Sequence, residues 1–290
     1  MVAAHVDRQC FDVSLPRRDS KTGDGHTGFT VEIYPTIDET DAFAWRDFTI
    51  DAMGWDPETH ELVDYFGGPD DLLAGVLRQT SEAFAENNLR MLQGGQFAAR
   101  FGFTFAPEST ELARSMADRF PELSTERVWG KWRKIATRGL HVTAALRALE
   151  TTTWLQHFPQ LAATRGIQRD AIGHAEGDVF THVGLTADET AKAADRAGLS
   201  SADPEVAVLR APVHDFGKVT HTPTGKGGRI TSHGHAEAGV EPAAQFFTGI
   251  GAPASASAPA RRRAHVPRLN RIHPIRDRCS PTHPLAPRSR

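Results

Sequence analysis

The sequence has little of several residue types, and each shortage argues against a class of protein. Only two of its 290 residues are cysteines, Cys10 and Cys279, and they lie far apart with no partner spacing. We therefore expect free thiols and neither a disulfide framework nor a zinc site. No apolar run approaches the roughly 18 residues that a membrane helix needs, and no basic-then-apolar leader opens the chain. These absences favour a cytoplasmic protein with no membrane partner.

Charge is present in ordinary amount but is unevenly distributed. The net charge is −3, yet residues 251–290 hold nine arginines and no lysine, with Asp277 as their one acid. That segment therefore carries about +8, and the first 250 residues carry about −11. A body this acidic does not favour general nucleic-acid affinity, so any RNA contact must be a local patch.

Residues 251–290 differ from the rest of the chain in composition as well. They hold seven of the eighteen prolines and show no periodic apolar pattern, which predicts a disordered basic tail. One interpretation is an arm that grips RNA. The other is a reading frame that shifts near residue 250, because a helical sequence is expected to continue there.

The remaining 250 residues have a coarse pattern of short strands followed by helices. Strands are predicted at 11–15 and 29–34, joined by a loop at 16–28, with a further short strand at 60–66 before the turn at Gly67-Gly68. Helices are predicted at 40–55 and 108–120, from Ser124 onward with the Ser124 side chain as cap, and at 140–150.

The most informative stretch is ENNLRMLQGGQFAARFGF at 86–103, for which we predict one helix. Apolar side chains recur near one stripe of this helix, at Leu89, Leu92, Phe97 and Phe101. Glu86, Arg90 and Gln93 share a second, polar face. That face has two interpretations: the solvated side of a core helix, or a carboxylate and a guanidinium that recognise a planar group such as a nucleobase.

Four more blocks accompany this stretch in order: FDVSLPRR at 11–18, RDFTIDAM at 46–53, DYFGGPDDL at 64–72 and STERVW at 124–129. From about residue 11 to residue 250, the chain resembles the tRNA CCA-adding enzyme and poly(A) polymerase family of class II nucleotidyltransferases. The resemblance implies a mostly helical α+β fold. It implies a truncated nucleotidyltransferase α/β domain at 1–80, a helical neck and body at 81–165, a partial helical HD domain at 170–250 and the tail at 251–290.

The resemblance also implies the chemistry. The family transfers nucleotides from CTP or ATP to the 3′-hydroxyl of tRNA with Mg²⁺ at the phosphoryl centre. The matching nucleotide-binding positions here are Arg46, Asp47, Asn87 and Arg90. Asp12 matches a catalytic carboxylate of the sheet. The alternative is an aspartate at the surface, on the edge of a strand, with no catalytic role.

The family's glycine-rich loop and metal-binding aspartate pair would precede Met1, so we expect the front of the catalytic domain to be absent. Such an absence leaves an open sheet edge that a partner chain could fill. We also expect impaired transfer, because several positions depart from the family pattern. Asn87 replaces an aspartate, Gln93 and Gln96 replace arginines, Asp51 replaces an asparagine, and Trp45 replaces an arginine. Gly94-Gly95 replaces an alanine pair, at a cost of roughly 1 kcal/mol each in a helix.

A second group of candidate site residues begins near His174. The runs containing His182, APVHDFGK at 211–218 and SHGHAEAG at 232–239 resemble the HD phosphohydrolase domain. The resemblance implies a divalent transition metal held by His182, His214 and Asp215, with His233 or His235 nearby and Lys218 either reaching a phosphate or ending its helix. Each histidine taken singly could equally be a surface residue. The alternative function is therefore a metal-dependent phosphohydrolase acting on nucleotides or 2′,3′-cyclic phosphates.

Overall fold

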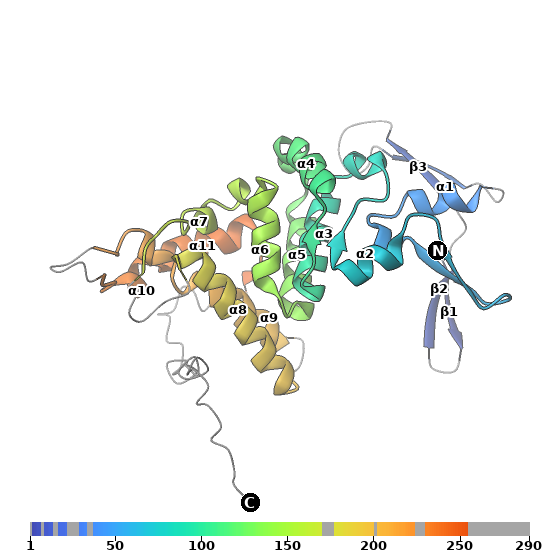
Figure 1. Cartoon of the computed structure of the whole chain (residues 1–290). Helices are drawn as coiled ribbons and strands as arrows, with labels where there is room; N and C mark the ends of the chain where they lie inside the picture. The colour runs from blue at the N-terminus through green and yellow to red at the C-terminus, as the bar shows by residue number, and fades with distance from the viewer. Residues whose placement is uncertain are drawn as a thin grey trace, which may run out of the picture.

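The computed structural model describes residues 2–6, 9–13, 17–21, 29–33, 37–169, 177–199, 202–223 and 230–254, the first four ranges and 202–206 as backbone only. Figure 1 shows strands at one end of the molecule, a central group of helices and a second helical group at the other end. Cys279 and the predicted tail beyond residue 254 lie outside the described residues.

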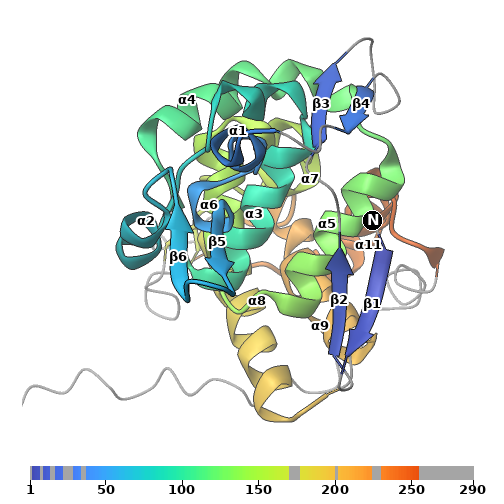
Figure 2. The same cartoon turned by 90° about the vertical axis from the view of Figure 1, so that its right-hand side faces the viewer.

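Four short strands form the first part of the chain. β1 (Val2–Val6) pairs antiparallel with β2 (Gln9–Val13), and β3 (Arg17–Lys21) pairs antiparallel with β4 (Phe29–Ile33). Figure 2 shows these two hairpins as separate ribbons. The strands predicted at 11–15 and 29–34 are present, but the loop predicted at 16–28 is wrong in part, because β3 lies within it.

The helix predicted at 40–55 is also wrong beyond its first residues. α1 (Glu39–Ala44) ends early, and the chain turns through the short helix η1 (Thr49–Asp51) into a hairpin of β5 (Met53–Asp56) and β6 (Glu61–Asp64). The cause is the burial of one side chain together with a local hydrogen bond. Phe48 is fully buried, and its backbone N–H donates to Asp51 Oδ1 at 2.8 Å, which fixes a turn where an isolated helix would continue. The predicted 60–66 strand matches β6.

The central helix starts later than predicted. After α2 (Gly68–Ala74) and the short helix η2 (Glu82–Glu86), Asn87 adopts extended backbone and α3 runs over Leu89–Phe101. Asn87 Oδ1 accepts from the Leu89 N–H at 3.1 Å, so its side chain competes with the helical bond. Glu86 therefore does not share a helix face with Arg90 and Gln93, which corrects that part of the prediction. The two-residue strands β7 (Val76–Leu77) and β8 (Thr104–Phe105) pair parallel beside α3.

Helices follow one another over most of residues 107–151. α4 (Pro107–Ser115) gives way to the short helix η3 (Ala117–Glu122), so the single helix predicted at 108–120 is two elements, and Pro121 lies in the second. α5 (Thr125–Arg138) follows with Ser124 as its N-cap residue. The Ser124 side chain makes no capping hydrogen bond to the described residues, so that detail of the prediction is wrong. α6 (Val142–Thr151) matches the predicted helix.

The last described part of the chain is helical. Its elements are η4 (Trp154–His157), α7 (Pro159–Ala162), α8 (Val179–Arg196), α9 (Ala202–Val213), η5 (Phe216–Val219), α10 (His235–Ala238) and α11 (Val240–Gly249). His214-Asp215 occupies the turn between α9 and η5, where Asp215 is the N-cap residue of η5.

One hydrophobic core runs through both helical groups. Trp132 of α5 packs edge-on against Phe158 and Phe246, with ring centroids 5.1 and 5.3 Å apart, which ties α5 to α11. At the other end Phe48 packs against Phe84, Phe97 and Phe105. The mostly helical α+β class is confirmed. No helix within the described ranges is long and apolar enough to cross a membrane.

Candidate nucleotide site and metal centre

Arg90 joins two of the sequence blocks that lie far apart in the chain. Its Nε lies 2.8 Å from Asp47 Oδ1, Nη2 donates to the Trp45 carbonyl at 2.8 Å, and Nη1 donates to the Ala83 carbonyl at 2.5 Å. The side chain is only 10% exposed, so burial and three partners fix the plane of the guanidinium. Nη1 and Nη2 each keep one N–H group that these contacts do not use, and the Nε N–H faces Asp47 but makes no hydrogen bond to the described residues.

Asn87 lies between α3 and α5. Its Oδ1, which accepts from Leu89, also lies 3.5 Å from Arg127 Nη2, at the outer limit of a hydrogen bond. An aspartate here would make this contact an ion pair, so the neutral amide weakens the link between the two helices. One turn further along, Lys131 Nζ donates to Gln93 Oε1.

The other residues of the predicted nucleotide site lie at several places in the fold. Arg46 is exposed at the turn after α1, adjacent to the half-buried Asp47. Gln96 is buried on α3. Asp12 lies in β2, of which only the backbone is described. The assignments of Asp12, Arg46, Asp47, Asn87 and Arg90 as catalytic or nucleotide-binding residues stay predictions.

The structure brings the predicted metal ligands together from separate segments of the chain. His182 of α8, His214 and Asp215 offer ligand atoms that all lie within 4.8 Å of one another. Asp215 is 1% exposed and forms the centre of the group. Its Oδ1 lies 3.3 Å from His214 Nε2, and its Oδ2 lies 3.6 Å from His182 Nε2.

His235 is a fourth member of this cluster. Its Nε2 lies 3.6 Å from Asp215 Oδ1, whereas His233 is exposed. Gly217 makes this approach possible, because a Cβ at that position would lie 1.9 Å from the His235 carbonyl oxygen. A side chain at residue 217 would therefore push α10 away from Asp215.

Backbone carbonyls orient two of the imidazoles. Nδ1 of His214 bonds the Ala211 carbonyl, and Nδ1 of His235 bonds the Ser232 carbonyl at 2.5 Å. With Nδ1 bonded to a carbonyl, Nε2 of each ring faces the carboxylate, and this is the arrangement found around metal-bound histidines. The donor set of imidazole nitrogens and one carboxylate fits a divalent transition metal.

Lys218 reaches the same carboxylate. Its Nζ donates to Asp215 Oδ2 at 2.7 Å, so it does not simply end a helix. Burial would raise the pKa of Asp215, but His214, Lys218 and His182 outweigh burial and hold that pKa below its usual value. The carboxylate is therefore ionised at neutral pH and available to a cation, with Lys218 as a competitor for one oxygen.

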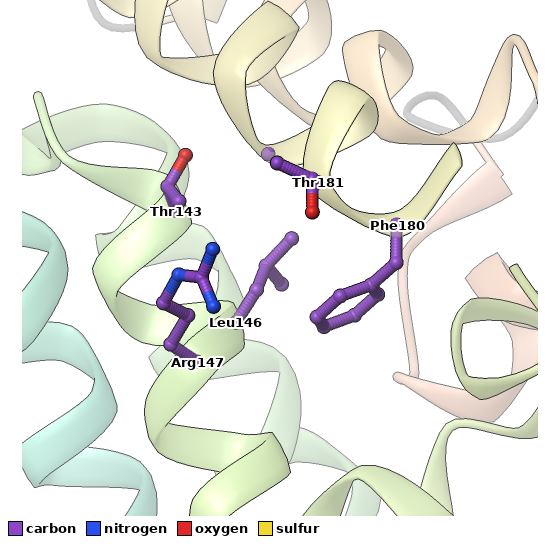
Figure 3. Close-up of a pocket in the computed structure, with 6 residues that line it drawn as sticks. Thr143, Leu146, Arg147, Phe180 and Thr181 are labelled. Carbon is purple, nitrogen blue, oxygen red and sulfur yellow. The ribbon is translucent and has the colours of Figure 1, made fainter. Parts of the chain in front are cut away.

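A small pocket lies where α6 crosses α8, and no residue of either site lines it. Figure 3 shows Leu146 and Arg147 on α6 facing Phe180 and Thr181 on α8. The empty space within it is about 170 Å³ with open solvent included, and it leaves no room for a water-sized molecule. This space is a packing gap between two helices.

Comparison with known proteins places the chain in a class. Residues 1–78 match the family model described as the poly A polymerase head domain. The Multifunctional CCA protein of Pasteurella multocida is 35% identical over 239 residues, which cover 80% of this chain and 54% of that protein. The Multifunctional CCA protein of Xanthomonas campestris is 34% identical over 225 residues, 73% of this chain and 51% of that one. The chain thus spans about half the length of the curated relatives it matches.

Solved structures give a weaker likeness. A Bacillus stearothermophilus CCA-adding enzyme in complex with CTP is 20% identical, with a TM-score of 0.46 over 90% of this chain and 65% of that one. A tRNA-processing enzyme is 19% identical, with a TM-score of 0.49 over 78% of this chain and 57% of that one. On the sequence matches, the chain belongs to the tRNA CCA-adding enzyme and poly(A) polymerase family.

Proposed function

We propose that this chain acts in tRNA 3′-end maturation, recognising CTP or ATP and the 3′ end of tRNA. The observation that carries the proposal is the ion pair between Arg90 and Asp47, which joins the RDFT block to the start of α3. A guanidinium held in one plane by Asp47, Trp45 and Ala83 can present its remaining N–H groups to one edge of a base. Arg46 and Asn87 complete the proposed nucleotide-binding set.

Phosphoryl transfer needs charge stabilisation as well as base recognition. When bound, Mg²⁺ supplies that stabilisation at the phosphoryl centre in transferases of this type. Asp12 is the residue of this chain that we assign as a carboxylate of that centre. Transfer by this chain is weak in our proposal, because Asn87 lacks the negative charge that would pair with Arg127 beside the base-reading guanidinium.

Incorporation of labelled CMP and AMP into tRNA that lacks its 3′ CCA tests this proposal. We expect slower incorporation than by the Pasteurella multocida relative, and at least a tenfold gain in Asn87→Asp because the carboxylate can pair with Arg127. Asn87→Ala is the matched control and should bring no gain. Incorporation as fast as that of the relative would contradict the impairment. No incorporation by wild type or Asn87→Asp, with no tRNA retained on a filter, would overturn the function.

The cluster around Asp215 supports a second activity. We propose that His182, His214 and Asp215 bind a divalent transition metal for hydrolysis of nucleotides or 2′,3′-cyclic phosphates. A metal at such a site activates water and polarises a phosphoryl oxygen. The chain's own contribution is the orientation of two imidazoles by backbone carbonyls and a buried, ionised carboxylate.

Nickel- or manganese-dependent phosphatase activity measures this second function. His214→Ala should lower the activity at least a hundredfold and weaken metal binding in titration calorimetry, because it removes a ligand beside Asp215. His233→Ala changes an exposed histidine two residues from His235 and should leave both unchanged. Equal loss in the two variants, or no metal uptake by wild type, would rule the site out.

A further inference from the structure

The hairpin of β5 and β6 and the helix α2 expose large apolar side chains. Within the described ranges eight large apolar or aromatic residues are exposed, and five of them lie between residues 55 and 73: Trp55, Leu62, Tyr65, Leu72 and Leu73. Single exposed apolar side chains need no explanation, but this many in one short stretch mark an interaction surface. The exposed part of residues 55–73 is called here the front surface.

The inner side of the hairpin is covered by α1, so its outer side is the one left open. A Cβ on Gly54 would lie 2.8 Å from the ring of Phe43 on α1. Trp55 and Leu62 are register partners and follow the Gly54–Val63 pair, so their side chains point to the opposite side of the sheet. Figure 2 shows β5 and β6 side by side, with α1 and α2 adjacent to them. The Trp55–Leu62 pair therefore lies on a sheet face that no described element covers, and Trp55 is 62% exposed.

Negative charge surrounds this apolar pair. Residues 38–75 hold eleven acids against one arginine, Arg46, and no lysine. Asp56 and Glu61 are register partners, so two carboxylates lie opposite one another on the hairpin, where like charges repel. Hydrogen bonds from two backbone N–H groups of the turn lower the pKa of Asp56 and keep it charged. Among the described residues neither carboxylate has an ion-pair partner, so a cationic partner would relieve the repulsion.

The chain itself carries a segment of the complementary charge. Residues 261–290 hold nine arginines, no lysine and one acid. Apolar side chains stand among these arginines, at Val266, Leu269, Ile272 and Ile275. A guanidinium stacks on the face of a tryptophan ring and forms paired hydrogen bonds with a carboxylate. The composition of the segment therefore matches both the apolar pair and the acids of the front surface.

The segment is long enough to reach the front surface of its own molecule. A Cβ on Gly251 would lie 2.7 Å from the Thr125 carbonyl oxygen, so the chain leaves the helical body at the start of α5. The 36 residues after Ala254 span up to about 120 Å when fully extended. A compact chain of 250 residues has a radius of gyration of only about 18 Å. Attachment to the same molecule also raises the effective concentration of the segment, so weak contacts suffice.

We propose that residues 261–290 dock on the front surface of the same molecule. Arginines of the segment stack on Trp55 and pair with Asp56 and Glu61, and its apolar side chains cover the exposed part of the hairpin. The inference does not rest on the proposed function, because it uses no nucleotide and no RNA contact.

A nitroxide attached to Cys279 in the full chain with Cys10→Ser tests the docking, because it broadens the NMR signals of protons near it. With ¹⁵N-labelled tryptophan the chain gives five indole N–H signals. At about 0.1 M salt the nitroxide should lower the Trp55 signal at least twofold relative to the reduced label, and it should leave the signal of the fully buried Trp154 unchanged. At about 1 M salt, where the Debye length falls from about 10 Å to about 3 Å, most of the Trp55 intensity should return.

Charge removal on the hairpin gives a second measurement. Glu58→Gln/Glu61→Gln changes two exposed carboxylates and should restore at least half of the lost Trp55 intensity. Asp118→Asn/Asp195→Asn, which changes exposed carboxylates on η3 and α8, is the matched control and should restore none. Thermal melting confirms that both variants are folded.

Three outcomes would overturn the docking. The first is no broadening of Trp55, or equal broadening of Trp55 and Trp154. The second is broadening that neither salt nor Glu58→Gln/Glu61→Gln reduces, because the contact would then not be ionic. The third comes from mixing ¹⁵N-labelled Cys10→Ser/Cys279→Ser chain with unlabelled chain that carries the nitroxide. Broadening of Trp55 in this mixture as strong as in the single chain would assign the contact to a second copy.

Discussion

Asp51 is a mostly buried carboxyl whose charge is costly in the folded protein. Burial, with a smaller contribution from the charge of Asp47, raises its pKa to about 6, although the Phe48 N–H donates to it. Since the folded pKa lies above the unfolded value of 3.8, this group favours the folded state fully below about pH 4. The contribution is lost as the pH rises through 6.

Asp51→Asn should therefore stabilise the protein at pH 8. The amide oxygen can still accept from Phe48, and no charge is buried, so we expect a gain of about 1–3 kcal/mol at pH 8 and little change at pH 4. Urea unfolding at the two pH values measures this difference. Glu61→Gln, an exposed carboxyl on β6, serves as the control. The same pH dependence in wild type and Asp51→Asn would show that Asp51 is not its source.

The residue types predicted where the candidate sites lie, but they did not predict which contacts each side chain makes. Arg90 was predicted to bind nucleotide because of the sequence block that contains it. The structure adds that its side chain is mostly buried and contacts three partners. Lys218 was predicted to reach a phosphate or end a helix, and it instead binds Asp215. Both differences arise from tertiary partners, which spacing along one helix does not reveal.

At the scale of elements, α3 shows why two adjacent glycines differ. A Cβ on Gly94 would lie 2.2 Å from the Phe105 ring and 2.7 Å from the Phe48 ring. A Cβ on Gly95 would meet nothing within 4 Å among the described residues. The sequence interpretation assigned both glycines the same cost, but the aromatic cluster requires glycine at 94 and not at 95.

Two alanine substitutions test this difference. Gly95→Ala should stabilise the protein by about 0.5–1 kcal/mol, because alanine loses less backbone entropy in a helix. Gly94→Ala should destabilise it by about 1–3 kcal/mol through overpacking against Phe48 and Phe105. Denaturant midpoints of the two variants give the comparison. Two changes of the same sign would contradict the packing described for α3.

Helices with a strong apolar period were predicted well, and their ends were not. α6 matches its prediction, while α3 starts three residues late because the Asn87 side chain competes for the Leu89 N–H. The helix predicted at 40–55 failed for a similar reason, since Phe48 and Asp51 form a local turn. Hydrogen bonds from short polar side chains decide these boundaries, and periodicity does not report them.

At the scale of the molecule, the order of the blocks predicted the family and the mostly helical α+β class. The sequence grouped His182 with Asp215 but left open whether His233 or His235 joins them, because this depends on the packing of α10 against η5. The boundaries proposed at residues 80, 165, 170 and 250 stay predictions. The apolar contact of Trp132 with Phe246 crosses from the proposed part 81–165 to the proposed part 170–250, so those parts share one core.

Selective nucleotide binding is the most direct test of the account, because base recognition by Arg90 is its central claim. Equilibrium titration should show CTP and ATP bound at least tenfold more tightly than GTP. Arg90→Lys keeps the charge but loses the planar fork, and this variant should bind the three nucleotides alike while remaining folded. Equal affinity for all three in wild type, or selectivity that survives in Arg90→Lys, would contradict the account.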